Sequence, residues 1–470
     1  MAHLRACPMV HEPIRRFWQL MAISAAGVLA GLCSALAQWP ERLEGHGGPV
    51  KSVVLDETGE RLLSTSFDYT ALLWNKPDDN SQISAPLRLT GHNAAVNDIR
   101  FLPGNRAASV SDDSDLIVWD LATGNILLRF PGLGEKVLSL EVSPNGRYVA
   151  VASWENQARL YDLEADDPGL IARLDNHRGN VNDVAFSLDS DKLFTASYDG
   201  GIRQFDAVSG AMERELINLG WGVNTLKVLP DGKSLLFGVT DGKLGVLDIE
   251  SGQETKVLPL HSRPVLSLAI SPDGKRAASG GGEGVIRVFD TVSWELLEEF
   301  QNPYGPVWGL AFTGNGDQLF YAGLDDQPHL WQVAPRKPFE PVDVHFPRRF
   351  QVSDADDPGE LQFARKCSVC HTLTPNGGNR AGPTLFGVFG RQVGTLPGYP
   401  YSKALLDADF VWNAKSIADL FDYGPDVITP GSKMPIQRLK SVEDRDALVA
   451  FLKHATNPNG SKAEHGGTAQ

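Results

Sequence analysis

The chain has 470 residues, of which 42% are hydrophobic, and a formal net charge of −15 at pH 7. This length predicts two or three domains with buried cores. The acidic balance argues against nucleic acid as a partner, because phosphate backbones are bound by clustered Lys and Arg.

The first 37 residues have the features of an export signal. Arg15 and Arg16 precede an apolar run from Phe17 to about Leu36, and Ala35-Leu36-Ala37 provides a small-x-small cleavage site. We therefore predict a signal peptide over 1–37 and a periplasmic protein. Two alternatives stay open. The run 17–37 is about long enough to remain as a membrane anchor, and Cys33 could be lipidated, although Leu32 disfavours lipidation.

Residues 39–334 repeat with a period of 42 to 45 residues. Each unit ends a strand-like run on an aromatic or apolar residue that follows an acid by six positions. The seven residues are Trp74, Trp119, Tyr161, Phe205, Leu247, Phe289 and Trp331. Short β-rich runs such as 50–55 and 265–270 are bounded by turns such as Ser271-Pro272-Asp273-Gly274.

This pattern resembles the WD-repeat family, and the resemblance implies a seven-bladed β-propeller. Residues 39–43 would then supply the outer strand of the last blade and close the ring. The resemblance also implies hydrogen-bonded networks in the first two units, where the required side chains are present: His46, Ser64, Asp68 and Trp74, and His92, Ser109, Asp113 and Trp119. Units three, five and seven lack this histidine, so we expect packing to hold their turns.

Residues 335–352 are rich in Pro and basic residues, which indicates an extended spacer. The tail 458–470 is rich in Gly, Ser and Lys, and we expect it to be disordered.

The pentapeptide Cys367-Ser368-Val369-Cys370-His371 has the spacing of a covalent haem attachment site. In such a site both thiols form thioethers to the porphyrin and the histidine is an axial iron ligand. Zinc would need further Cys or His ligands nearby, and a dithiol redox site would need a βαβ context. Met434 lies in a Pro-flanked loop and is the only Met after the pentapeptide, so we expect it to be the second axial ligand.

Residues 353–457 resemble a class I (mitochondrial-type) cytochrome c, which implies an all-α domain after the propeller. The matching pieces include Gly359, Phe363, Gly382-Pro383, Phe389-Gly390-Arg391 and the Pro-Gly-Ser-Lys-Met loop. By this resemblance the Pro383 carbonyl accepts the Nδ1–H of His371. The resemblance also implies that Arg391, Tyr401 and Trp412 contact or neutralise the haem propionates. The chain departs from the family at Phe421, where a Tyr usually lies behind the Met ligand.

Together these features predict a multidomain protein, a seven-bladed propeller followed by an all-α domain with one covalent haem c whose metal ligands are His371 and Met434. We expect one-electron transfer without a catalytic residue, with a redox partner docking on the propeller or at the haem edge. Two alternatives stay open. One is an oxidoreductase with a substrate or second cofactor on the propeller, and the other is a redox-responsive interaction protein.

Overall fold

The computed structural model describes residues 38–78, 83–335, 357–368, 370–374, 382–397, 399, 401, 403–429, 434 and 438–457. The predicted signal peptide, nearly all of the spacer and the tail lie outside the described residues. Among the described residues, no helix has the length and apolar character needed to cross a membrane.

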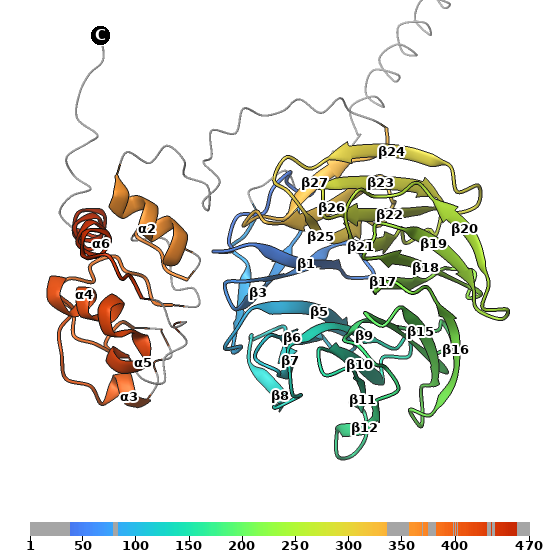
Figure 1. Cartoon of the computed structure of the whole chain (residues 1–470), viewed down its shortest axis with the longest axis horizontal. Helices are drawn as coiled ribbons and strands as arrows, with labels where there is room; N and C mark the ends of the chain where they lie inside the picture. The colour runs from blue at the N-terminus through green and yellow to red at the C-terminus, as the bar shows by residue number, and fades with distance from the viewer. Residues whose placement is uncertain are drawn as a thin grey trace, which may run out of the picture. The chain divides into compact units, whose positions relative to one another are not determined.

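Residues 50–332 form seven antiparallel sheets, one for each repeat of the sequence (Figure 1). Within each sheet the strands pair in chain order. The first three sheets contain β1 (Val50–Leu55), β2 (Arg61–Ser66), β3 (Thr70–Asn75) and β4 (Leu87–Thr90); β5 (Val96–Leu102), β6 (Arg106–Ser111), β7 (Leu116–Asp120) and β8 (Ile126–Phe130); and β9 (Val137–Val142), β10 (Tyr148–Ser153), β11 (Ala158–Asp162) and β12 (Gly169–Leu174).

The remaining four sheets follow the same order, and the last has three strands. They contain β13 (Val181–Phe186), β14 (Lys192–Ser197), β15 (Gly201–Asp206) and β16 (Met212–Asn218); β17 (Val223–Val228), β18 (Ser234–Val239), β19 (Leu244–Asp248) and β20 (Glu254–Leu258); β21 (Val265–Ile270), β22 (Arg276–Gly281), β23 (Val285–Asp290) and β24 (Leu296–Gln301); and β25 (Val307–Phe312), β26 (Gln318–Gly323) and β27 (His329–Gln332).

The first strands of neighbouring sheets lie side by side, and β25 contacts β1, so the seven sheets close into a ring. The predicted closure of the last blade is confirmed, although the closing segment makes only a few backbone contacts at β27. Arg42 bridges His329 of β27, Leu43 N–H donates to the Pro328 carbonyl at 3.0 Å, and Leu330 N–H donates to Glu41 at 2.9 Å. The chain therefore satisfies the outer edge of β27 with a few residues instead of a full strand.

The middle strands are almost entirely buried, because they face a neighbouring blade on both sides. The strands β10 and β14, for example, are buried over nearly every residue. Apolar side chains from adjacent blades form continuous clusters, such as Val110 and Val118 with Val149 and Tyr161. This packing explains why the repeats read as apolar runs and not as strictly alternating strands.

The predicted histidine networks of the first two blades are present. In the first, Trp74 Nε1–H donates to Ser64 Oγ at 2.9 Å, Ser64 lies 2.7 Å from His46 Nε2, and His46 Nδ1 lies 3.2 Å from Asp68. The second blade repeats this arrangement with Trp119 and Ser109 at 2.8 Å. All four side chains of the first network are buried, so each polar group needs these partners.

Two further blades have the same network without the Trp. In the fourth, His177 contacts Thr195 at 2.6 Å and Asp199 at 3.2 Å. In the sixth, His261 contacts Ser279 at 2.8 Å and Glu283 at 2.6 Å. The aromatic positions in these blades are Phe205 and Phe289, which fill the space but donate no hydrogen bond.

The expectation that packing alone holds the turns of units three and seven is wrong. In the third blade Glu155 accepts a hydrogen bond from Arg159 at 2.7 Å. In the seventh, Asp325 lies 2.6 Å from His329 Nε2, and Tyr304 and Tyr321 stack on the two faces of that imidazole. The acid of the turn is therefore paired in these blades too, by a cation or an imidazole from the next strand.

The region 357–457 has few helices. They are α2 (Pro358–Lys366), α3 (Lys403–Leu406), α4 (Ala414–Tyr423), α5 (Pro425–Ile428) and α6 (Val442–Ala455), of which α3 and α5 are only four residues long. The prediction of an all-α domain therefore holds only in the sense that helices are the main regular elements in the described part of this region.

The helices α2 and α6 cross closely because Gly359 has no side chain. A Cβ at this position would meet the Ala447 carbonyl of α6. Phe363 and Phe451 then pack at a ring-centroid distance of 5.7 Å. Asp357 caps α2, and Ser441 Oγ caps α6 by accepting the Asp444 N–H at 3.0 Å. This crossing supports one wall of an apolar pocket, to which Lys366 of α2 and Leu452 of α6 contribute.

Candidate haem pocket

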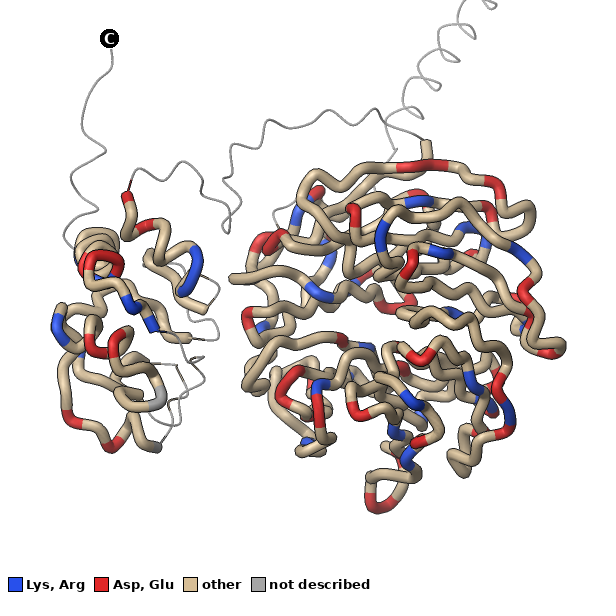
Figure 2. The backbone as a smooth tube through the Cα atoms, viewed as in Figure 1, with Lys and Arg blue, Asp and Glu red and all other residues tan. Residues whose placement is uncertain are grey.

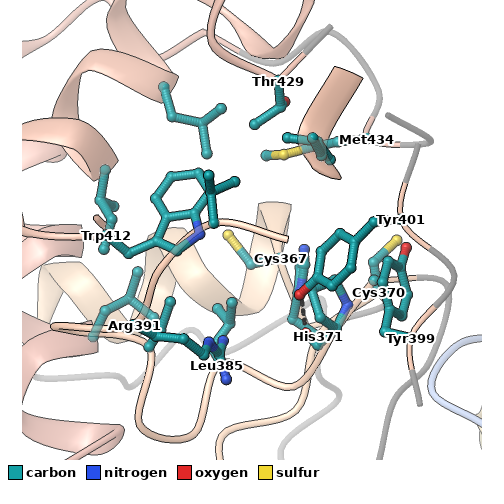
Figure 3. A pocket seen from close by; sticks show the side chains of 18 of the residues that line it. Cys367, Cys370, His371, Leu385, Arg391, Tyr399, Tyr401, Trp412, Thr429 and Met434 are labelled. Atoms are coloured by element: carbon teal, nitrogen blue, oxygen red, sulfur yellow. Dashed lines mark hydrogen bonds between the residues drawn. The ribbon is translucent and has the colours of Figure 1, made fainter. Parts of the chain in front are cut away.

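An apolar pocket lies among α2, α4 and the segments that follow them, with about 1060 Å³ of empty space, part of it open to solvent (Figure 3). All eight residues predicted for the site line this pocket: Cys367, Cys370, His371, Pro383, Arg391, Tyr401, Trp412 and Met434.

The pentapeptide reaches the pocket because α2 ends at Lys366. The Cys367 N–H still bonds to Phe363 as the helix cap, and the His371 N–H donates to the Cys367 carbonyl at 2.9 Å. This tight turn presents Cys367, Cys370 and His371 to the same space, as Figure 3 shows. Burial raises the pKa of the Cys367 thiol to about 12, with a smaller effect from Cys370, so a free thiol here is un-ionised at neutral pH.

The imidazole of His371 is held in place by its neighbours. Its Nδ1 lies 2.7 Å from the Pro383 carbonyl oxygen, the contact expected from the sequence. Because a carbonyl only accepts, Nδ1 carries the proton and Nε2 is left with its lone pair. Gly382 lies against the ring, and a Cβ there would be 2.7 Å from both ring nitrogens. This tautomer suits a metal ligand.

Met434 lies on the wall opposite His371, with the pocket between them (Figure 3). The buried residues on its side of the core are apolar, including Ile417, Leu420 and Phe421. Phe421 is 3% exposed and carries no hydroxyl. Thr429 also lines this wall, and its hydroxyl donates to the Pro425 carbonyl at 3.0 Å.

Polar side chains gather on another part of the lining. Arg391 donates to the Thr384 carbonyl at 2.8 Å, and burial lowers the pKa of its guanidinium. Tyr399 and Tyr401 pack edge to face at 4.8 Å, and burial raises the pKa of Tyr399 to about 12. Trp412 packs on Phe410 at 5.0 Å. Sequence reasoning missed Tyr399 as a lining residue, although it lies two positions before Tyr401.

The lining fits a haem by its chemistry. Two thiols beside a histidine match the covalent attachment, and imidazole nitrogen with thioether sulfur is a known axial pair for iron. The apolar walls suit a flat macrocycle, and a guanidinium and phenols suit its carboxylates. Among the described residues, no group of three or more His, Cys, Asp and Glu side chains gathers to hold a metal ion.

Comparison with known proteins agrees with part of this description. The family model of the WD domain, G-beta repeat, matches residues 39–75, 85–120, 124–162, 169–206 and 252–290. The chain thus contains WD40 repeats. The first three strands of the fifth blade and all three strands of the seventh lie outside these matches, although each belongs to a sheet of the ring.

A second set of matches is to proteins named cytochrome c. The chain is 43% identical over 100 residues to that of Sesamum indicum and 42% identical to that of Cannabis sativa, in each case over 21% of this chain and 87% of the relative. It is 40% identical to that of Gibberella zeae, over 92% of the relative. Over this length the chain belongs to the cytochrome c family.

These comparisons correct the resemblance drawn from the sequence. That resemblance named a class I cytochrome c domain fused C-terminal to the propeller. The matches to cytochrome c extend over only about 100 residues of 470, and they do not fix this stretch at the C-terminal end. What they establish is WD40 repeats in the N-terminal part and a cytochrome c likeness of limited length.

Proposed function

We propose that this protein is a one-electron carrier whose pocket holds one haem, bound through thioethers to Cys367 and Cys370 and ligated by His371 and Met434. The observation that carries the proposal is the convergence of these four side chains on one apolar pocket. The likeness to cytochrome c supports electron transfer, and the WD40 repeats support a role in binding other proteins.

When bound, the haem would supply an iron that cycles between two oxidation states. The chain's own residues provide the rest. Pro383 keeps the proton on Nδ1 of His371, so Nε2 is the nitrogen that would ligate the iron. The apolar wall near Met434 excludes water from that face. Arg391, Tyr401 and Trp412 would bind the haem carboxylates.

We further propose that the protein works in the periplasm. Covalent haem attachment takes place outside the bacterial inner membrane, and the predicted signal at 1–37 would direct export. Fractionation of cells expressing the full chain tests this, because the proposal requires the haem-stained band in the periplasmic fraction. Retention in the membrane fraction would instead favour an uncleaved anchor.

The haem proposal is tested by expression in cells that make c-type cytochromes. We expect coloured protein that keeps its haem through acid extraction and a denaturing gel, with an intact mass raised by one haem. Cys367→Ala and Cys370→Ala together should abolish this retention, while Ser368→Ala, between them, should not. Colourless wild-type protein of unmodified mass contradicts the proposal.

A further inference from the structure

The propeller is the acidic part of the chain: it contains 42 of the 58 Asp and Glu residues. Residues 39–334 contain 24 Lys and Arg against 42 Asp and Glu, a net charge of −18, whereas residues 357–457 contain 11 against 10. Figure 2 shows the acids spread over the blades. A field of this sign attracts cations and raises the rate at which a basic protein arrives.

Three exposed aromatic side chains lie on one side of the ring, in the loops of blades three to five. Trp154 and Tyr198 occupy equivalent positions, each just before the turn acid that connects the second and third strands of its blade. Trp221 lies in the connection from β16 to β17, next to Tyr198, which contacts Gly222. Their exposed fractions are 44%, 63% and 62%.

Rings on this side of the propeller already take cations. Lys136 Nζ lies 5.3 Å from the centre of the Trp154 ring, and Lys51 Nζ lies 5.2 Å from that of Trp308. Trp308 in turn packs on Phe67, which occupies the place of Tyr198 in the first blade. Among the described residues, Tyr198 and Trp221 have no ring or cation contact, so their π faces are available.

The charge of the same loops favours a cation as the occupant. The loops on this side of blades three to five contain five acids and three bases: Glu135, Glu155, Asp175, Asp199, Asp241, Lys136, Arg178 and Lys243. Lys136 is paired with Asp112 at 2.9 Å and Lys243 with Glu254 at 2.8 Å. Glu155 and Asp199 are paired with Arg159 at 2.7 Å and Arg203 at 2.9 Å, which leaves Glu135, Asp175 and Asp241 as the acids of these loops without an ion pair among the described residues. Gly220 and Gly222 flank Trp221, so no neighbouring side chain in the sequence covers the indole.

We propose that Tyr198 and Trp221 form a docking surface for a basic protein, whose Lys or Arg side chains stack on the two rings. A desolvated cation over Trp or Tyr gains more than the same cation over an aliphatic side chain, because the ring quadrupole attracts it. The acidic propeller draws the partner in, and the two rings fix where it binds. This surface is independent of the haem pocket.

The test uses the full-length protein and hexa-arginine as the probe, with hexacitrulline as an uncharged probe of similar shape, in isothermal titration calorimetry at low salt. We expect Tyr198→Ala with Trp221→Ala to weaken hexa-arginine binding about 5- to 30-fold, from two exposed cation–π contacts. Tyr423→Ala is the matched control, because Tyr423 is 55% exposed and lies outside the propeller.

A second double variant, Tyr198→Leu with Trp221→Leu, keeps apolar area but removes both π faces. The proposal requires this variant to bind hexa-arginine as weakly as the alanine variant does. Wild-type affinity in either double variant, or equal binding of hexacitrulline, overturns the proposal, since either result means that the rings do not recognise the cation.

Discussion

Gly382→Ala tests whether the placement of the His371 ring matters for the pocket. The new Cβ would lie 2.7 Å from Nδ1 and Nε2 and closer still to Cε1, whereas ordinary contacts begin at 3.4 Å. Cε1 would lie 2.3 Å from the new Cβ, so the ring must move by about 1.1 Å to reach 3.4 Å, unless the backbone of Gly382 gives way. A ring displaced this far keeps its 2.7 Å bond to Pro383 only if Pro383 moves with it.

The expected cost follows from these contacts. Overpacking of a filled site costs about 1–3 kcal/mol, and the lost hydrogen bond adds about 1 kcal/mol. The variant should thus lose about 2–4 kcal/mol of unfolding free energy in the described helical region. Its haem should stay attached through the two cysteines, but the spectrum and reduction potential should shift, because Nε2 no longer lies where the wild-type ring holds it.

Gly314→Ala is the matched control for this substitution. A Cβ at Gly314 meets no atom within 4 Å, and its φ lies outside the left-handed region. Urea unfolding and redox titration of both variants give the comparison. If Gly382→Ala keeps wild-type stability, spectrum and potential, then the His371 ring does not lie against Gly382 in the folded protein.

Three further outcomes are expected. Met434→Ala should leave the haem covalently bound but open an iron site, so that the protein gains binding of carbon monoxide or cyanide, seen optically; unchanged ligand binding would exclude Met434 as an axial ligand. Trp74→Phe should cost about 1–3 kcal/mol in urea unfolding, since it removes the donor to Ser64 and leaves a small cavity. Burial alone would raise the pKa of Asp68, but His46 and Arg88 hold it well below its ordinary value. Its contribution to stability is therefore present above the unfolded pKa of about 4 and is lost as pH falls toward the folded value. Asp68→Asn should flatten this acid dependence, and an unchanged slope between about pH 4 and 2 would contradict the pairing.

The repeat period allowed the propeller to be predicted because the turn acid and the residue that ends the third strand must occupy equivalent positions in every blade. Side chains that perform one task in one blade therefore recur 42 to 45 residues later. The pocket was predictable for a different reason. Covalent attachment requires two thiols and a histidine at fixed spacing, so the sequence itself records the chemistry. Tyr399 has no such constraint, and only the fold shows that it lines the pocket.

What sequence could not supply is how each blade compensates for a missing network member. The turn acid is present in every blade, but Asp68 of the first is the one that is fully buried, and Asp241 of the fifth is exposed. Where the acid is at least partly buried, a cation or an imidazole pairs with it. The third blade uses Arg159 and the seventh uses His329. The sixth shows the limit of this tolerance. Glu283 is one methylene longer than Asp, so one carboxylate oxygen reaches His261, while Oε2 is buried and has no hydrogen-bond partner in the described part of the chain. Packing around Phe289 therefore stabilises this blade despite an incompletely satisfied turn. The ring as a whole depends on packing between neighbouring blades more than on any single hydrogen-bond network.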